Sequence, residues 1–152
     1  KPHYFMQNLL MAAQSIAQQG AMYFALADGK MGLIDSRDIS EFAAHVLTNA
    51  GHEGKTYTLT GPASVSIHQI AAAISEAIGK TVTYVPVTAE AERQTILQMG
   101  IDEWMANLLG DYSAAYSLNW GDLVTDDFQR VTGKSPRSIA QFAKDFAGAF
   151  GK

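Results

Sequence analysis

The fold is decided by residues 65–87, VSIHQIAAAISEAIGKTVTYVPV, in which a helical pattern leads directly into a strand pattern. Ser66 and Gln69 have the spacing of a capping box, in which the two side chains satisfy backbone N–H groups at a helix N-terminus. Apolar residues then recur every three or four positions as far as Gly79, a common helix terminator. The β-branched and aromatic residues of 81–87 favour a strand. The pattern therefore predicts a capped helix followed by a strand.

The residues before this unit add a second strand. Residues 55–60, KTYTLT, are rich in residues that favour strands, and they end at a Gly61-Pro62 turn. The order strand, helix, strand within about thirty residues predicts a βαβ unit, whose crossover is almost always right-handed.

Upstream of that unit, a helix and a hairpin are expected. The helix spans residues 5–18 and stops at Gly20. Residues 21–34 contain two apolar runs on either side of Asp28-Gly29, and this dipeptide is a hairpin signal.

A second helix follows the hairpin. Asp38 caps it, with Glu41 at the third helical position, and Gly51 ends it. Its buried stripe is expected to consist of Ile39, Phe42, Ala43, Val46 and Leu47.

From Thr88 onwards the pattern is mainly helical. Helices are expected over residues 90–99, over 102–117, after Thr125 and from Pro136. The residues that the helix over 102–117 should direct inward are Trp104, Met105, Leu108, Leu109 and Tyr112. The chain as a whole is α/β with a helix-rich C-terminal part.

Composition narrows the classes of protein. The 152 residues suit one domain, with 47% hydrophobic and 17% charged residues. The net charge is −4 and the 11 Lys and Arg are scattered, whereas nucleic-acid binding requires clustered cations. No apolar run approaches the ~20 residues of a membrane-spanning helix, so a cytoplasmic location without a membrane partner is expected. The absence of cysteine excludes disulfides and thiolate metal sites.

Familiar catalytic motifs do not occur in these residues. A dinucleotide fold uses Gly-x-Gly-x-x-Gly between a strand and a helix, but the nearest match here, Gly29 to Gly32, leads into a β-like stretch. It is interpreted as a turn. There is no Tyr-x-x-x-Lys pair and no Gly-x-Ser-x-Gly elbow. The four histidines show no i, i+4 pairing, so no metal site is predicted.

Two groups of side chains leave alternatives open. Asp35-Ser36-Arg37-Asp38 is either a pair of carboxylates with a cation at a site, or a helix cap at Asp38 beside a structural Arg37–Asp35 pair. Glu90, Glu92 and Arg93 are interpreted as a solvated helix face rather than as an acid–base set. Four aromatic residues either line an apolar substrate pocket or belong to the core, namely Trp104, Tyr112, Tyr116 and Trp120.

Three stretches, in this order, resemble a known family. They are residues 1–10, KPHYFMQNLL; residues 34–39, IDSRDI; and residues 55–62, KTYTLTGP. The first is similar to the Arg-Pro-x-x-Phe-x-x-Asn-Leu pattern of NmrA-like proteins, which are NAD(P)-binding relatives of the short-chain dehydrogenases/reductases. The other two resemble the Asp-x-Arg-Asp-Ile element of that family and the strand that follows it. The resemblance covers nearly all residues and is best over 1–87.

The resemblance implies the C-terminal part of a Rossmann-like α/β fold. Residues 1–87 would hold late sheet strands and crossover helices, and residues 88–152 a helical substrate lobe, within one compact domain. The residues placed beside the nicotinamide–ribose end of the cofactor would be Pro2, Phe5, Met6, Gln7 and Asn8. The substrate pocket is assigned to Trp104 and Tyr112.

The same resemblance implies a cofactor and partners. Family members bind NADPH or NADH, and several reduce quinones or similar electrophiles, while others sense the redox state. Because the phosphate-binding loop of the family lies upstream of the matched region, tight binding of NADP or NAD to these residues alone is not expected. Uncovered sheet edges would have to pair with an N-terminal half or in a homo-oligomer. The alternative is a non-catalytic interaction module of the same fold.

Overall fold

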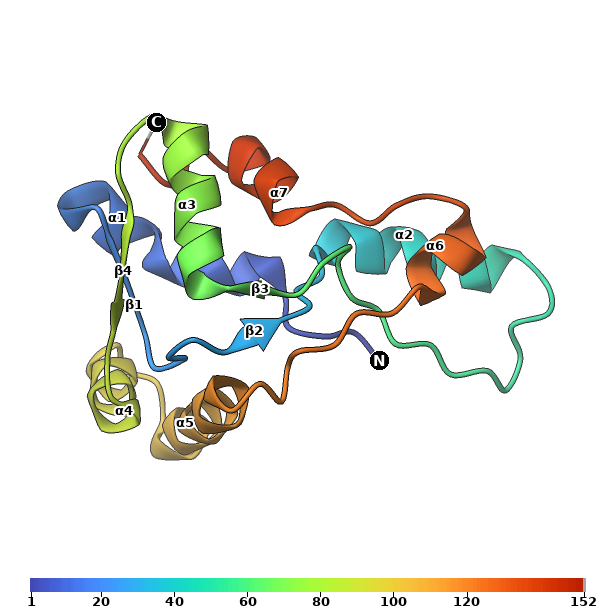
Figure 1. Cartoon of the computed structure of the whole chain (residues 1–152). Coiled ribbons are helices and arrows are strands. Elements are labelled where there is room, and N and C mark those ends of the chain that lie inside the picture. Colours follow the sequence, from blue (N-terminus) through green and yellow to red (C-terminus); the bar gives the residue numbers. More distant parts are fainter. Residues whose placement is uncertain (152) are drawn as a thin grey trace.

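Helices dominate the computed structural model, which describes residues 1–151 (Figure 1). The helices, in chain order, are η1 (Met6–Ala12), α1 (Ala13–Gln19), α2 (Ser36–Thr48), α3 (Ile67–Ile78), α4 (Ala89–Gln98), α5 (Glu103–Ser117), α6 (Asp127–Thr132) and α7 (Ile139–Asp145). The strands are β1 (Ala21–Phe24), β2 (Lys30–Met31), β3 (Val65–Ser66) and β4 (Thr83–Pro86). The 3-10 helix η1 continues into α1, which ends at the left-handed Gly20, so the helix expected over residues 5–18 is confirmed.

The strands pair differently from the predicted hairpin. β1 pairs in parallel with β4, with Ala21 opposite Thr83, and β2 pairs antiparallel with β3. The prediction that Asp28-Gly29 joins two paired strands is therefore wrong. Gly29 instead lies where the backbone of Tyr116 in α5 approaches, and a Cβ atom added there would come within 2.1 Å of the Tyr116 carbonyl oxygen. The turn allows α5 to pack closely and does not form a hairpin, because β1 and β2 each pair with a strand that is distant in the sequence.

The strand predicted over residues 55–60 is reduced to a single parallel bridge between Leu59 and Pro2. The Leu59 N–H donates to the Lys1 carbonyl at 3.0 Å, and the His3 N–H donates to the Leu59 carbonyl at 2.9 Å. On the other side of the N-terminal segment, Phe5 forms a parallel bridge with Ile34. Residues 1–5 are thus held between two extended segments, and β4, the expected partner of 55–60, pairs with β1 instead.

The second helix begins earlier than predicted. Its N-cap is Asp35, whose carboxylate accepts the Arg37 N–H at 2.9 Å, whereas Asp38 lies inside α2 and is buried. The helix ends at Thr48, before the expected Gly51. Leu47 is 83% exposed, so its assignment to the buried stripe is wrong, while Phe42 is buried as expected.

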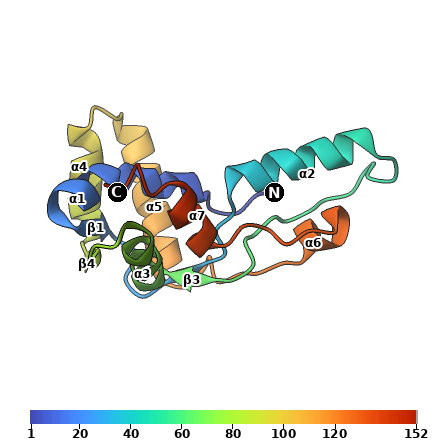
Figure 2. The same cartoon turned by 90° about the horizontal axis from the view of Figure 1, so that it is seen from above.

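The core is built around α3 and α7, which pack against each other (Figures 1 and 2). The predicted capping box is present, with the Ser66 N–H donating to Gln69 Oε1 at 2.9 Å, and the helix ends at the left-handed Gly79. The fully or nearly fully buried apolar residues of these two helices and the segment after α7 include Ile67, Ile70, Ile74, Phe142 and Phe150. The helix signal in residues 65–87 is therefore confirmed.

The helices α4 and α5 pack against each other, and α2 and α6 form a separate pair (Figures 1 and 2). Trp104 is 69% exposed and Tyr112 is 44% exposed, so the expectation that α5 directs them inward is wrong. α5 is buried through Ala106, Ser113 and Tyr116 instead. The small residues Ala106 and Ser113 on this face allow α5 to approach α4 closely. With this face buried, Trp104 and Tyr112 lie on the exposed side of α5.

We expect Ile70→Ala to lower the free energy of unfolding by about 2–5 kcal/mol, because it removes a fully buried side chain and leaves a cavity in a packed core. Leu47→Ala is the control and should change it by less than about 0.5 kcal/mol, because Leu47 is exposed. Urea denaturation followed by circular dichroism measures both. Equal losses for the two variants would contradict the arrangement of the core.

Candidate functional site

The residues predicted to line the cofactor lie at the start of the first helix, where the extended segment 1–5 leads into η1. Met6 is 2% exposed and belongs to the core, whereas Phe5 is 39% exposed and Pro2 and Asn8 are also exposed. The Met6 N–H donates to the Ile34 carbonyl at 2.9 Å, which fixes the start of the helix on the extended segment. The structure thus brings Pro2, Phe5 and Asn8 to the surface and keeps Met6 inside.

Gln7 has a structural role in this segment. Its side-chain Nε2 donates to Asp35 Oδ1 at 2.9 Å, and its Oε1 accepts the Ser36 N–H at 2.9 Å. Both ends of the amide are therefore engaged at the N-terminus of α2. The neighbouring Asn8 is left on the exposed side of the helix.

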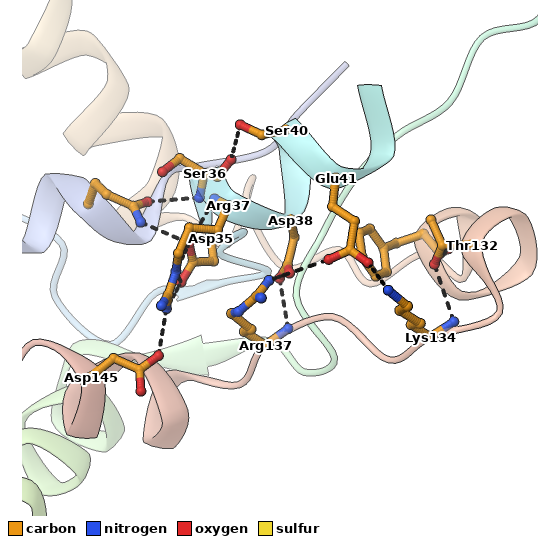
Figure 3. A network of polar contacts seen from close by, with 12 residues as sticks. Asp35, Ser36, Arg37, Asp38, Ser40, Glu41, Thr132, Lys134, Arg137 and Asp145 are labelled. Atoms are coloured by element: carbon orange, nitrogen blue, oxygen red, sulfur yellow. Dashed lines mark hydrogen bonds and ion pairs between the residues drawn. The ribbon is translucent and has the colours of Figure 1, made fainter. Parts of the chain in front are cut away.

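Asp35 is the centre of the polar network that Gln7 joins (Figure 3). Its side chain is fully buried, and Arg37 Nη2 lies 2.6 Å from its Oδ2 and 2.8 Å from Oδ2 of Asp145 in α7. Burial alone would raise the pKa of Asp35, but hydrogen bonds from Arg37 and Gln7 outweigh it and hold that pKa below its ordinary value. Arg37 also lies over the ring of Phe146, with its guanidinium carbon 5.3 Å from the ring centre. The network joins η1, α2 and α7.

A second ion-pair group follows on the same helix (Figure 3). Asp38 is 1% exposed, and it accepts the Arg137 backbone N–H at 2.7 Å and forms an ion pair with the Arg137 guanidinium. Burial raises the pKa of Asp38, and the Arg137 contacts only partly offset this. Glu41 pairs with Lys134 on the same side. Of the two interpretations of residues 35–38, the structure has the helix cap with an Arg37–Asp35 pair, and the cap is Asp35 rather than Asp38.

A cavity of about 510 Å³ opens between the first helix, β1 and α4. Its lining is mostly apolar, and the residues important here are Met11, Phe24, Val87, Ile96, Met99 and Glu92. Cavities of this size take small organic ligands, which bind through an apolar wall and a few fixed polar groups. The cavity is therefore a candidate substrate site.

The carboxylate of Glu92 is held at the edge of this cavity. Its Oε2 accepts the Ser113 hydroxyl at 2.5 Å and its Oε1 accepts the Ala25 N–H at 3.2 Å. Glu92 is half-buried, so the interpretation of this residue as part of a solvated face is wrong. The helical pattern of α4 could not indicate this, because the contacts of Glu92 come from Ala25, just after β1, and from Ser113 in α5.

Tyr4 lies near Glu92, beneath the start of the first helix. Burial, followed by the nearby Glu92 carboxylate, raises the pKa of Tyr4 to about 12. Its ring packs edge-on against Tyr116, with ring centres 5.4 Å apart. The phenol is therefore protonated at neutral pH and can donate a hydrogen bond but cannot act as a base.

Trp104 and Tyr112 lie outside the lining of the cavity. Tyr112 instead belongs to an exposed aromatic group, with its ring centre 6.5 Å from that of Trp120. The assignment of Trp104 and Tyr112 to a substrate pocket stays a prediction. Among residues 1–151 no group of His, Asp or Glu side chains is arranged to hold a metal ion, and no helix is long and apolar enough to cross a membrane.

The chain is similar in sequence and in fold to several known proteins. The chain is 42% identical over 151 residues to the NAD(P)H azoreductase of Xenophilus azovorans, a match that covers 99% of the chain and 53% of that protein. The structure of the NADPH-dependent quinone oxidoreductase QOR2 of Escherichia coli, complexed with NADPH, superposes with a TM-score of 0.85 at 25% identity, covering 96% of the chain and 52% of QOR2. The triphenylmethane reductase of Citrobacter sp. shares the fold, with a TM-score of 0.83 at 24% identity over 97% of the chain and 51% of that protein. No family model matches the sequence.

The fold is the C-terminal portion of an NAD(P)-binding, Rossmann-like α/β fold. The chain belongs to the NmrA-like family of atypical short-chain dehydrogenases/reductases and corresponds to the C-terminal part of its members. It spans about half the length of the curated relatives it matches. The expected membership of the NmrA-like family is thereby confirmed.

We expect Asp35→Asn to lower the free energy of unfolding at pH 7 by about 1.5–3 kcal/mol, because asparagine still caps α2 but loses the hydrogen-bonded ion pair. The pKa of Asp35 in the folded chain lies below its ordinary value of 3.8, so its stabilising effect is present above that value and is lost as the pH falls through the folded-state pKa. The difference between variant and parent should therefore stay constant from pH 7 to about pH 5 and shrink only below about pH 4.

Urea denaturation at several pH values measures this difference. The control is Asp126→Asn, because the Asp126 side chain is 83% exposed. A difference for Asp35→Asn that stays constant down to the lowest pH would contradict the role assigned to its charge.

Proposed function

We propose that the chain forms the substrate side of an NAD(P)H-dependent reductase. The observation that carries the proposal is a line of exposed side chains on the first helix. Asn8 and Met11 lie three residues apart in the 3-10 helix η1, where such residues lie above one another, and Phe5 is the extended residue directly before that helix. Met11 lines the cavity, so the line leads from the predicted nicotinamide wall into the candidate substrate site.

The names of the relatives support a redox function. The relatives include an NAD(P)H azoreductase and quinone oxidoreductases, and QOR2 and the triphenylmethane reductase are complexed with NADPH or NADP(H). The nicotinamide would supply the hydride, and the protein would supply binding and orientation. In this proposal Phe5 and Pro2 form the wall against the nicotinamide, and Asn8 offers the polar group. A small quinone-like electrophile would occupy the cavity.

The phosphates and the adenine of the cofactor would bind outside residues 1–152 in this proposal. Contacts on the nicotinamide side alone give low affinity, because they must offset the entropy of association and of ordering the ligand. The β1–β4 pair also has an exposed apolar residue outside the cavity lining, Val85, which is 36% exposed. We propose that this exposed part of the pair packs against an N-terminal half or in a homo-oligomer.

An interaction module without catalysis is the second candidate. An exposed apolar group favours it, in which Leu118 is 84% and Trp120 is 65% exposed. Exposed patches of this kind often mark contacts between proteins. The two candidates differ in whether a bound cofactor leads to turnover.

A chimera separates them. We expect that replacing the matched C-terminal part of the Xenophilus azovorans azoreductase with residues 1–152 gives a folded protein that oxidises NADPH in the presence of a quinone. Residues 1–152 alone should show no saturable NADPH binding, because the nicotinamide-side contacts are too few. Absorbance at 340 nm and calorimetric titration measure these results, and the parent azoreductase is the control. A folded chimera that binds NADPH without turnover would favour the module, and tight NADPH binding by residues 1–152 alone would contradict the assignment of the phosphates to other residues.

Substitutions of the neighbouring residues Gln7 and Asn8 should affect different properties of that chimera, its stability and its KM for NADPH. Asn8→Ala should raise the KM for NADPH, by about tenfold for one lost hydrogen bond of roughly 1.4 kcal/mol, and should lower stability less than Gln7→Ala does. Gln7→Ala should lower the free energy of unfolding, because it removes both partners at Asp35 and Ser36, with a smaller change in KM. Steady-state kinetics and urea denaturation measure the two effects. An unchanged KM in Asn8→Ala would contradict the assigned nicotinamide wall.

A further inference from the structure

Glu92 carries the only charged side chain among the residues that line the cavity. Its carboxylate accepts two hydrogen bonds, from the Ser113 hydroxyl and the Ala25 N–H, whereas a carboxylate has about four acceptor positions. Part of its hydrogen-bonding capacity is therefore unused. A half-buried carboxylate beside apolar walls interacts strongly with any charge placed in the same cavity, because water screens it less than at the surface.

No cation of the described residues compensates Glu92. Within residues 1–151 it takes part in no ion pair. The adjacent Arg93 is engaged elsewhere, since its guanidinium lies 3.0 Å from Glu103 and 3.6 Å from Glu90 and donates to Asn107 at 2.6 Å. The cavity thus combines one negative charge with an apolar wall.

The rest of the lining is suited to a flat cation. The aromatic residues Tyr23 and Phe24 are among the lining residues, and aromatic rings attract cations through their π-faces. Met11 and Met99 add polarisable thioethers, which adapt to the shape of a ligand. The Tyr23 hydroxyl is already used, because it donates to Gln19 at 2.7 Å.

We infer that this cavity selects aromatic cations, and that Glu92 is the residue that recognises their positive charge. A neutral quinone can use the apolar walls alone, whereas a cationic aromatic ligand also gains the attraction of the carboxylate. A ligand with a negative charge is repelled by Glu92. The charge preference of the cavity is independent of whether a cofactor binds.

The consequence for the reaction rests on the proposed reductase function. When NAD(P)H transfers a hydride to an electron-poor carbon of an aromatic cation, the C–H bond of the nicotinamide breaks and a new C–H bond forms with the same two electrons. The cation becomes a neutral product and the nicotinamide becomes oxidised, so no proton is needed. This agrees with the absence of a free acid other than Glu92 among the lining residues. The neutral product also loses its attraction to Glu92, which favours its release.

The test uses a matched pair of ligands, 10-methylacridinium, which is a cation, and acridine, which is neutral at pH 8. Fluorescence titration of residues 1–152 should show that the cation binds about tenfold more tightly than acridine, which corresponds to about 1.4 kcal/mol. Glu92→Gln should remove this preference and leave acridine binding unchanged. The glutamine amide can still accept the Ala25 N–H and contact Ser113, so the variant keeps the local hydrogen bonds. The matched control is Glu90→Gln, which makes the same change on α4 outside the cavity lining.

A second variant covers a failure of Glu92→Gln to fold. Thr95→Lys adds a cation to the cavity lining one turn along α4, at an exposed position, and should likewise abolish the preference for 10-methylacridinium. Equal binding of the two ligands by the parent chain, or a preference that survives both substitutions, would overturn the inference.

The chimera with the azoreductase separates this inference from the proposed function. If the chimera reduces none of the acceptors with NADPH while the chain binds 10-methylacridinium through Glu92, the reductase proposal fails and the cation site stands. If the chimera reduces a quinone but Glu92→Gln leaves kcat/KM for 10-methylacridinium unchanged, the reductase proposal stands and the cation site fails. If the inference is right, Glu92→Gln lowers kcat/KM for 10-methylacridinium about tenfold and that for the quinone less than twofold.

Discussion

The carboxylate of Asp35 has no contact with solvent, and a buried charge of this kind requires both a counter-ion and hydrogen bonds. Arg37 supplies the charge and Gln7 a further hydrogen bond, so the first helix is tied to the start of α2. Arg37 also reaches Asp145, which ties α7 to the same point. Because Gln7 is turned inward by this network, its neighbour Asn8 lies on the exposed side, in line with Phe5 and Met11. The buried ion pair thus sets the orientation of the helix that carries the candidate site.

Two carboxylates in the chain are treated differently by their surroundings. Asp35 is compensated by a guanidinium and four hydrogen bonds from Arg37 and an additional one from Gln7, and its role is structural. Glu92 is held by a hydroxyl and a backbone N–H but has no cation of the described residues beside it. An uncompensated, half-buried carboxylate costs stability. Because Glu92 lines an apolar cavity, a cationic ligand can supply the missing counter-ion, and the unpaired carboxylate then contributes to ligand binding.

The elements that follow from local sequence could be predicted, and those that depend on distant contacts could not. The capping box of Ser66 and Gln69 and the end at Gly79 involve residues within a few positions of each other, and both are present. The hairpin at Asp28-Gly29 failed because the partner of β1 is β4, about sixty residues away along the chain. Asp35 and Asp38 are both good caps from their sequence, and distant contacts distinguish them, that of Gln7 with Asp35 and that of Arg137 with Asp38. The outward position of Trp104 and the inward contact of Glu92 were missed for the same reason, because the packing of α4 on α5 selects the buried face of each helix.

The candidate site separates the groups that hold the fold from the groups that face a ligand. Gln7, Asp35 and Arg37 are engaged with one another inside the molecule, whereas Asn8 and Met11 lie on the exposed side of the first helix. Substitutions on the ligand side can therefore change which acceptor is bound without removing a contact that the fold requires. This arrangement gives a physical reason why proteins of one fold are named for different acceptors, among them azo compounds, quinones and triphenylmethane dyes. In this chain the residue that would distinguish charged from neutral acceptors is Glu92, because it carries the only charged side chain among the residues that line the cavity.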